Sequence, residues 1–127
     1  MSENDPPRIV VIIEDEPVSR QSTVALIQRA GYRALTAGSL AQAREVLSGV
    51  IPDVILLDIN LPDGSGVQFL AELKADERTA QVPVVLVTAM EADALPVGLE
   101  RAAAILTKPP RERTLLAAVA AACSRKR

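Results

Sequence analysis

Residues 53–66 read Asp53-Val54-Ile55-Leu56-Leu57-Asp58-Ile59-Asn60-Leu61-Pro62-Asp63-Gly64-Ser65-Gly66, and this stretch decides the fold. The apolar run from Val54 to Leu57 is typical of a strand that is buried on both faces of a sheet. The run ends on the carboxylate of Asp58, which a buried strand tolerates only where the charge meets water or a cation. Ligands bind at the carboxyl ends of strands in open α/β sheets, so Asp58 stands where a site would form.

The composition restricts the class of protein. The 127 residues suffice for one domain, and a hydrophobic content of 49% with 2% aromatic residues predicts an aliphatic core. The net charge of -2 argues against a nucleic-acid or membrane surface, so we expect neither partner. The one cysteine, Cys123, excludes an internal disulfide and fits a reducing cytoplasm, where we expect the protein to act. Histidine is absent, which excludes Ser-His-Asp and Cys-His catalysis.

Strand and helix patterns alternate five times along the chain. Strands are expected at residues 9–13, 32–37, 54–57, 82–87 and 104–106. Helices are expected from Pro17, after the capping residues Ser39 and Ser65, and from Arg111. This alternation predicts an α/β fold, a flavodoxin-like doubly wound (βα)5 protein with five parallel strands in the order 2-1-3-4-5. We expect a flexible lead-in at residues 1–7, one domain at 8–124 and a basic tail at 125–127.

The pattern of the first helix predicts which of its sides is buried, whereas the fourth helix has the weakest pattern. The residues expected on the inner side of the first helix are Val18, Ala25, Leu26 and Ala30. In residues 90–103, Pro96 and Gly98 interrupt the helical pattern, so we expect a fourth helix that is short, irregular or frayed.

Polar side chains follow four of the five expected strands: Glu14 with Asp15, then Asp58, Thr88 and Lys108. The flavodoxin-like order makes the first and third strands neighbours, so Asp15 and Asp58 should face each other. Clustered carboxylates repel one another unless a cation holds them, and oxygen ligands without His or Cys favour Mg²⁺. A lysine ammonium and a threonine hydroxyl suit a phosphoryl group, and a carboxylate nucleophile would form an acyl phosphate.

Each of these residues also has a plainer interpretation when it is taken alone. An acidic pair before a helix often stabilises the helix dipole, and an aspartate after a strand is commonly a turn residue. Thr88 alone would be interpreted as a helix cap, and Lys108 as a solvated lysine. The joint pattern favours a functional site, because all four groups fall at carboxyl ends of separate strands.

Over residues 8–123 the sequence resembles the receiver domain of bacterial two-component response regulators. The matching motifs are Glu14-Asp15, Asp58-Ile59-Asn60-Leu61-Pro62-Asp63-Gly64, Thr88-Ala89 and Thr107-Lys108-Pro109. The resemblance implies that Asp58 accepts a phosphoryl group from a phosphohistidine of a sensor histidine kinase or a phosphotransfer protein. It further implies that Mg²⁺ is bound by the side chains of Asp15 and Asp58, by the backbone carbonyl of Asn60 and, through water, by Glu14.

The resemblance also assigns the phosphoryl-binding and switch positions. Thr88, Ala89 and Lys108 would bind the phosphoryl oxygens, and Pro109 would follow a cis peptide bond. Ile105 stands at the switch position, where the family commonly has an aromatic residue that changes rotamer. A β-branched aliphatic side chain is stiff, so we expect phosphorylation to order or shift residues 90–103 instead.

Three functions remain open from the sequence. The first is a receiver that signals by contact with an unidentified downstream protein, with no enzyme activity beyond its own phosphotransfer and autodephosphorylation. The second is a receiver-like scaffold that works without phosphorylation. The third is an aspartyl-phosphate phosphatase of the haloacid dehalogenase type. The motif of that family has a second acidic residue where this sequence has Asn60, which argues against this function.

Overall fold

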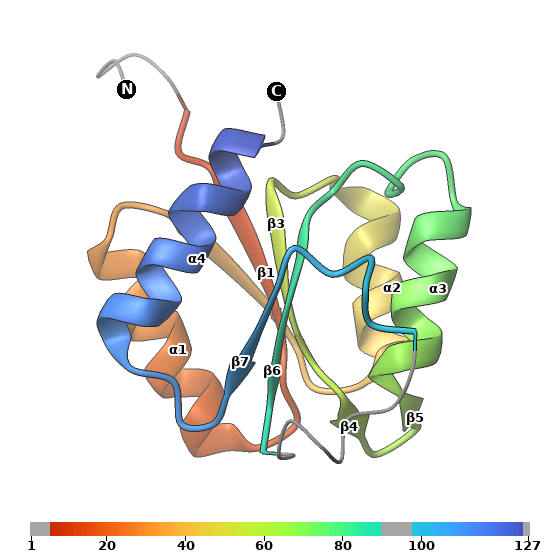
Figure 1. Ribbon diagram of the computed structural model, residues 1–127, viewed down its shortest axis with the longest axis horizontal. Coiled ribbons are helices and arrows are strands. Elements are labelled where there is room, and N and C mark those ends of the chain that lie inside the picture. The colour runs from red at the N-terminus through yellow and green to blue at the C-terminus, as the bar shows by residue number, and fades with distance from the viewer. Residues whose placement is uncertain (1–5, 90–97, 126–127) are drawn as a thin grey trace.

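The computed structural model describes residues 6–89 and 98–125, which form a five-stranded parallel sheet covered by helices on both faces (Figure 1). The strands lie in the order β2-β1-β3-β6-β7. Their bounds are β1 (Ile9–Ile13), β2 (Arg33–Ala37), β3 (Val54–Asp58), β6 (Val84–Thr88) and β7 (Ala104–Thr107). This is the flavodoxin-like order 2-1-3-4-5, so the predicted fold is confirmed.

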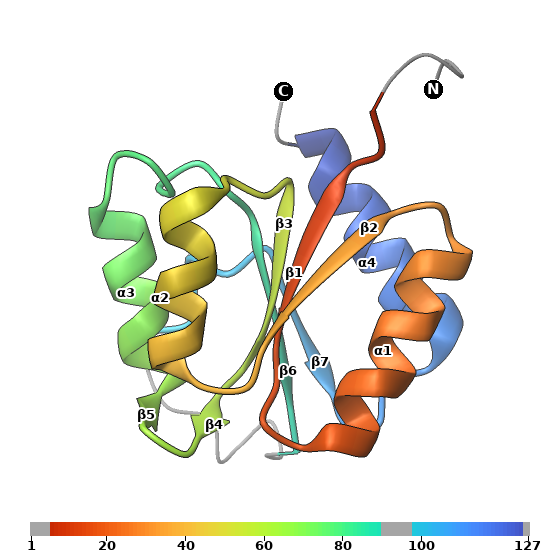
Figure 2. The same ribbon diagram turned by 180° about the vertical axis from the view of Figure 1, so that it is seen from behind.

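The helices of the described residues are α1 (Pro17–Arg29), α2 (Leu40–Gly49), α3 (Gly66–Ala75) and α4 (Glu112–Arg125). Helices α1 and α4 cover one face of the sheet, and α2 and α3 cover the other, as the two opposite views show (Figures 1 and 2). Every residue of β3 is buried, as the apolar run that precedes Asp58 predicts for a central strand.

Two apolar layers separate the sheet from its helices. The layer under α2 and α3 includes Val11, Ile13, Leu40, Leu47, Ile55, Leu57, Phe69, Leu70 and Leu73. The layer under α1 and α4 includes Val10, Ile12, Leu26, Ile27, Leu56, Val85, Leu115 and Val119. Successive residues of β1 and β3 alternate between the two layers, because side chains of a strand point to opposite faces of the sheet.

The predicted inner side of α1 is wrong in three of its four residues. Leu26 is buried, as is Ile27, whereas Ala25 and Ala30 are exposed and Val18 is 70% exposed. The helix rests on the sheet through the adjacent pair Leu26 and Ile27. Small apolar residues occur on all sides of α1, so the sequence pattern does not identify the buried side.

The starts of helices α2 and α3 agree with the capping residues that the sequence predicts. The Ser39 hydroxyl accepts a hydrogen bond from the backbone N–H of Gln42 (3.2 Å), and the Ser65 hydroxyl accepts one from Val67 (3.1 Å). The Gln42 side chain accepts from the N–H of Gly38 (2.7 Å), one residue before the cap. Both predicted helix starts are therefore confirmed.

A short antiparallel hairpin interrupts the path from β3 to α3. Strand β4 (Asn60–Leu61) pairs with β5 (Gly64–Ser65), and Gly64 has a positive φ of 155°. The sequence predicts only a turn here, since two-residue strands are too short to produce an alternating pattern. The hairpin matters because it begins two residues after Asp58.

The expectation of a short or frayed fourth helix concerns residues 90–103, of which 90–97 lie outside the described residues. In the described part, Gly98 has a positive φ of 96° and Leu99 is buried. The backbone N–H of Ala102 then donates to the carbonyl of Leu99 (3.0 Å), which makes a turn before β7 begins.

Candidate functional site

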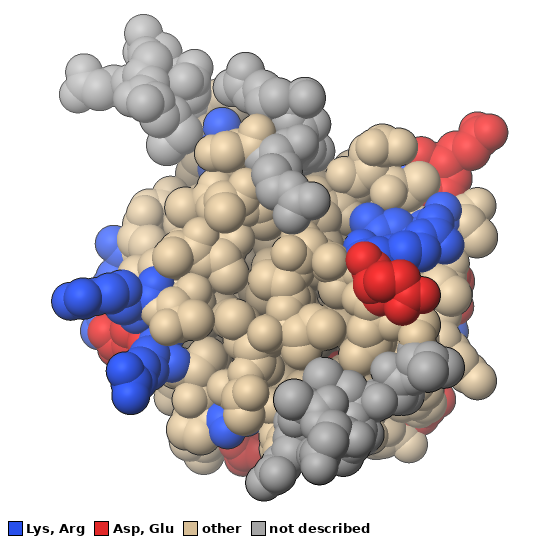
Figure 3. Space-filling model, in the orientation of Figure 1, with Lys and Arg blue, Asp and Glu red and all other residues tan. Residues whose placement is uncertain are grey.

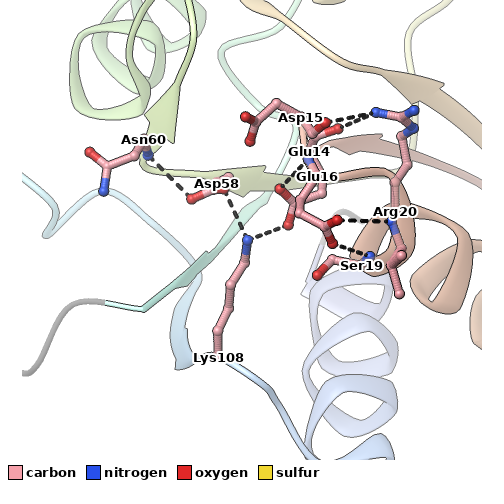
Figure 4. A network of polar contacts seen from close by, with 9 residues as sticks. Glu14, Asp15, Glu16, Ser19, Arg20, Asp58, Asn60 and Lys108 are labelled. Atoms are coloured by element: carbon pink, nitrogen blue, oxygen red, sulfur yellow. Dashed lines mark hydrogen bonds and ion pairs between the residues drawn. The ribbon is translucent and has the colours of Figure 1, made fainter.

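The carboxyl ends of four strands bring the candidate residues together at one edge of the sheet. Figure 4 shows Asp15, Asp58 and Lys108 among them. Glu14 and Asp15 follow β1, Asp58 ends β3, Thr88 ends β6, and Lys108 follows β7. Strand β3 pairs with β1 on one side and with β6 on the other, which puts Asp58 in the middle of this edge. The topology alone therefore explains why residues far apart in sequence meet here.

Lys108 joins two of the carboxylates. Its ammonium group donates hydrogen bonds to Glu14 Oε1 and to Asp58 Oδ2, the latter at 3.0 Å. The side chains of Glu14 and Asp58 are only 8% and 10% exposed, so the ion pairs are poorly screened by solvent. Burial acts to lower the pKa of Lys108, but the hydrogen bonds and charges of Glu14 and Asp58 outweigh it and raise that pKa.

Three carboxylates of this edge are close enough to share a cation. Ligand oxygens of Glu14, Asp15 and Asp58 all lie within 4.8 Å of one another. The backbone N–H of Asn60 donates to Asp58 Oδ1 (3.2 Å), so the hairpin β4–β5 begins beside the same cluster. An oxygen-only donor set of this kind fits a hard divalent cation such as Mg²⁺.

Two residues that the sequence analysis does not identify hold the acidic loop in place. The Glu16 carboxylate accepts hydrogen bonds from the backbone N–H groups of Ser19 (2.7 Å) and Val18 (3.2 Å), which lower its pKa and cap α1. The Arg20 guanidinium donates to the backbone carbonyls of Glu14 (2.9 Å) and Asp15 (3.3 Å). An acidic residue directly before Pro17 is a sequence signal for the cap, whereas nothing local identifies Arg20.

The other side of the edge is formed by β6 and β7. Thr88 is buried and pairs with Thr107, and the exposed Ala89 follows it. The backbone N–H of Lys108 donates to the carbonyl of Thr88 (2.7 Å), and the Lys108–Pro109 peptide bond is cis. The structure thus brings Thr88 and Lys108 to adjacent positions beside Asp58.

Ile105 lies apart from this edge. It pairs with Leu86 in the middle of β7 and is 41% exposed. Charged side chains gather at the margins of the face that carries β7 and α4, and its centre is largely uncharged (Figure 3).

A cleft of about 420 Å³ opens beside the site between α1 and α4. Its floor is the sheet, and it reaches Glu14, Asp58 and Lys108. The remaining walls include Val18, Ser19, Ser22, Thr23, Pro109, Pro110 and Leu115. The cleft therefore gives access to Asp58, and among the described residues the one charged residue on its walls away from the site is Glu112.

The fold and this edge together define a flavodoxin-like protein with an acidic, lysine-bridged site at the switch point of its sheet. The model of the response regulator receiver domain family matches residues 10–120. Protein PilH of Pseudomonas aeruginosa is 31% identical over 109 residues, which are 84% of this chain and 90% of that protein. The chain therefore belongs to the response regulator receiver domain family of two-component signalling systems.

Two further comparisons agree with this assignment. The phosphate regulon transcriptional regulatory protein PhoB of Pseudomonas aeruginosa is 37% identical over 120 residues, which are 93% of this chain but 52% of PhoB. The chain thus spans about half the length of this relative. A crystal structure of a sensor protein from Polaromonas sp. JS666 has a TM-score of 0.89 and 26% identity, and the match covers 96% of this chain and 100% of that one.

None of the helices in residues 6–89 and 98–125 combines the length and the apolar character that crossing a membrane requires.

Proposed function

We propose that this chain is the receiver of a phosphorelay and that Asp58 accepts a phosphoryl group from a phosphohistidine. The observation that carries the proposal is the placement of Asp58 within ligand distance of two other carboxylates and in an ion pair with Lys108. A haloacid dehalogenase-type phosphatase is disfavoured, because the matching family is a signalling domain. A scaffold that works without phosphorylation is disfavoured by the completeness of this charged site.

The proposed transfer step uses the side chains at this edge of the sheet. An Asp58 carboxylate oxygen attacks phosphorus, the P–O bond forms as the P–N bond to the donor imidazole breaks, and the electron pair leaves with the imidazole. Lys108 would neutralise charge on the phosphoryl oxygens, and Thr88 and Ala89 would donate hydrogen bonds to them. Mg²⁺ would supply further neutralisation, held by Asp15, Asp58, the Asn60 carbonyl and, through water, Glu14.

The donor is a sensor histidine kinase or a phosphotransfer protein, and we propose that it reaches Asp58 over the cleft between α1 and α4. Asp58 and the exposed Val18 both line this cleft. An exposed apolar side chain beside a charged site suits a protein contact, because burying it on docking is favourable.

The remaining features are proposed on the same basis. Residues 8–124 form the receiver domain, which acts in the cytoplasm and has no reaction beyond its own phosphotransfer and autodephosphorylation. It signals by contact with a downstream protein rather than with nucleic acid or membrane. Because no aromatic residue occupies position 105, we propose that phosphorylation shifts residues 90–103 as a unit.

Intact mass measurement after incubation with acetyl phosphate and Mg²⁺ tests the acceptor. We expect a gain of one phosphoryl group that is lost in Asp58→Asn. Asp53→Asn is the matched control, since Asp53 stands at the other end of β3, where its carboxylate accepts from Ile9 N (2.7 Å). Undiminished labelling of Asp58→Asn would refute the assignment, and an unlabelled wild-type chain would favour the scaffold.

Thermal unfolding with and without Mg²⁺ tests the metal ligands. A ligand that binds only the folded state raises the melting temperature, and Asp15→Ala should remove both this rise and the labelling. Lys108→Ala should keep the rise, since the lysine competes with the metal for Glu14 and Asp58. An unchanged rise in Asp15→Ala would exclude Asp15 as a ligand.

A further inference from the structure

Asp63 connects the loop after Asp58 to a helix that is distant in the sequence. It lies in the turn of the hairpin β4–β5, between Leu61 and Gly64. Its Oδ1 accepts a hydrogen bond from the backbone N–H of Leu40 (2.8 Å), and its Oδ2 accepts one from Ala41 (3.0 Å). These N–H groups begin α2, have no partner within the helix and hold the pKa of Asp63 below its ordinary value.

Two glycines of the same loop, Gly64 and Gly66, lie in close contact with neighbouring residues. A Cβ atom on Gly64 would lie 2.8 Å from the Leu40 side chain, so the turn packs directly on the first residue of α2. A Cβ on Gly66 would lie 2.4 Å from the carbonyl oxygen of Asp58, so the end of the hairpin packs against the acceptor residue itself. The loop from Asp58 to Gly66 is therefore fixed at both ends, and Asp63 supplies its polar attachment.

This loop carries Asn60, whose backbone N–H donates to Asp58 Oδ1 and whose pairing with Ser65 closes the hairpin. Displacement of the hairpin would move Asn60 relative to Asp58. Groups outside the ligand set that orient ligands commonly alter metal affinity when they are removed.

We propose that Asp63 is a positioning residue that fixes the Asp58–Gly66 loop on the N-terminus of α2 and thereby couples cation binding at the loop to α2. The proposal rests on the function proposed above, because it takes the cation to be Mg²⁺ at Asp58 and Asn60. Coupling between two sites is reciprocal, so Mg²⁺ should also strengthen the Asp63 hydrogen bonds to α2. Phosphorylation of Asp58 would then be transmitted to α2 by a path that does not use Ile105.

A helix cap with no effect on the site is the rival explanation, and Ser39 provides the control that separates the two. Its hydroxyl caps the same helix end by accepting from Gln42 N, but Ser39 adjoins α2 in sequence and has no hydrogen bond to the Asp58–Gly66 loop among those of the described residues. Loss of either cap weakens α2, whereas only loss of Asp63 releases the loop.

The test compares the wild type with Asp63→Ala, Asp63→Asn and Ser39→Ala. Calorimetric titration with MgCl₂ should give a Kd about 10-fold weaker in Asp63→Ala, a smaller loss in Asp63→Asn, which keeps one acceptor oxygen, and a Kd within about 2-fold of wild type in Ser39→Ala. Amide hydrogen exchange followed by NMR should show that Mg²⁺ slows Leu40 and Ala41 in the wild type and in Ser39→Ala, but not in Asp63→Ala.

The outcomes distinguish this inference from the function on which it rests. Equal Mg²⁺ affinities in Asp63→Ala and Ser39→Ala, or unchanged Leu40 and Ala41 exchange in a wild type that binds Mg²⁺, would overturn the coupling and leave the proposed function intact. A wild-type chain that binds no Mg²⁺ would overturn the metal-dependent function and the coupling with it.

Discussion

The two faces of the sheet are built differently, although they share the same strands. On the α2 and α3 face, Arg44 forms two hydrogen bonds to Glu72, both at 2.9 Å, and Arg78 donates to the Leu47 carbonyl (3.0 Å). On the α1 and α4 face, an open cleft of about 420 Å³ separates the helices. Hydrogen bonds therefore connect the elements of the α2 and α3 face, which also carries the hairpin after Asp58. The α1 and α4 face instead has a cleft that reaches Asp58.

The difference arises from the side chains. The α2 and α3 face includes Phe69, which is the one phenylalanine of the chain and is buried beneath Arg44. The α1 helix places Ser22 and Thr23 on the wall of the cleft, where larger residues would fill it. We infer that the closed face keeps the acceptor loop in position and that the open face admits the donor.

Removal of core side chains should show the largest difference between the two faces. Phe69→Ala should lower the free energy of unfolding by about 3–5 kcal/mol, because a large cavity forms in a closed layer. Leu115→Ala should cost about 2 kcal/mol, at the low end of the usual range, because Leu115 already borders the cleft. Chemical denaturation measures both values. Equal losses would show that the cleft-side layer is as tightly packed as the other.

A contact made through the cleft should have the next largest effect. Val18→Gln should slow phosphotransfer from a histidine kinase that labels the wild type by about 10-fold, which corresponds to about 1.4 kcal/mol of lost contact. Labelling by acetyl phosphate should be unchanged, since this small donor needs no docking surface.

Ile51→Gln is the matched control for Val18→Gln. Ile51 is 47% exposed but precedes β3, at the opposite edge of the sheet from the site. Kinase transfer should therefore be unaffected by this variant. A similar slowing in both variants, or none in Val18→Gln, would argue against docking over the cleft.

The strands and the candidate site residues could be predicted because their signals are local. The apolar runs before Glu14 and Asp58 are continuous, and parallel strands necessarily place their carboxyl ends together. The contacts of Asp63 with Leu40 and of Arg20 with the Glu14 carbonyl could not be predicted, because they depend on how separate elements pack. The buried side of α1 could not be predicted either, because it depends on how the helix packs on the sheet. Val18 and Ala25 match the helical period but are exposed.

Surface ion pairs should give a smaller difference between the faces. Double-mutant cycles should give about 0.5–1 kcal/mol for Arg44 and Glu72, which make two parallel hydrogen bonds at half-exposed positions. The corresponding pair of the open face, Arg29 and Glu112, is 3.4 Å apart and largely exposed, so its coupling should be close to zero. A larger coupling for Arg29 and Glu112 would mean that α1 and α4 are held together more firmly than the cleft suggests.

The smallest expected effect is on the pH dependence of the melting temperature. It compares the acidic residue that caps α1, Glu16, with the one that caps α2, Asp63. Hydrogen bonds from backbone N–H groups lower the pKa of Asp63 and that of Glu16 below their ordinary values. A carboxylate whose pKa is lowered by folding stabilises the protein above its unfolded pKa, and this contribution is lost as the pH falls through the folded value.

Asp63→Asn and Glu16→Gln remove the titration, so each variant should melt at a slightly lower temperature than the wild type near neutral pH. The two differences should shrink below about pH 4, and both carboxylates are exposed, so added salt should reduce them as well. Thermal unfolding from pH 7 down to about pH 3 measures these differences, and a difference that stays constant over that range would show that the charge of the cap contributes nothing.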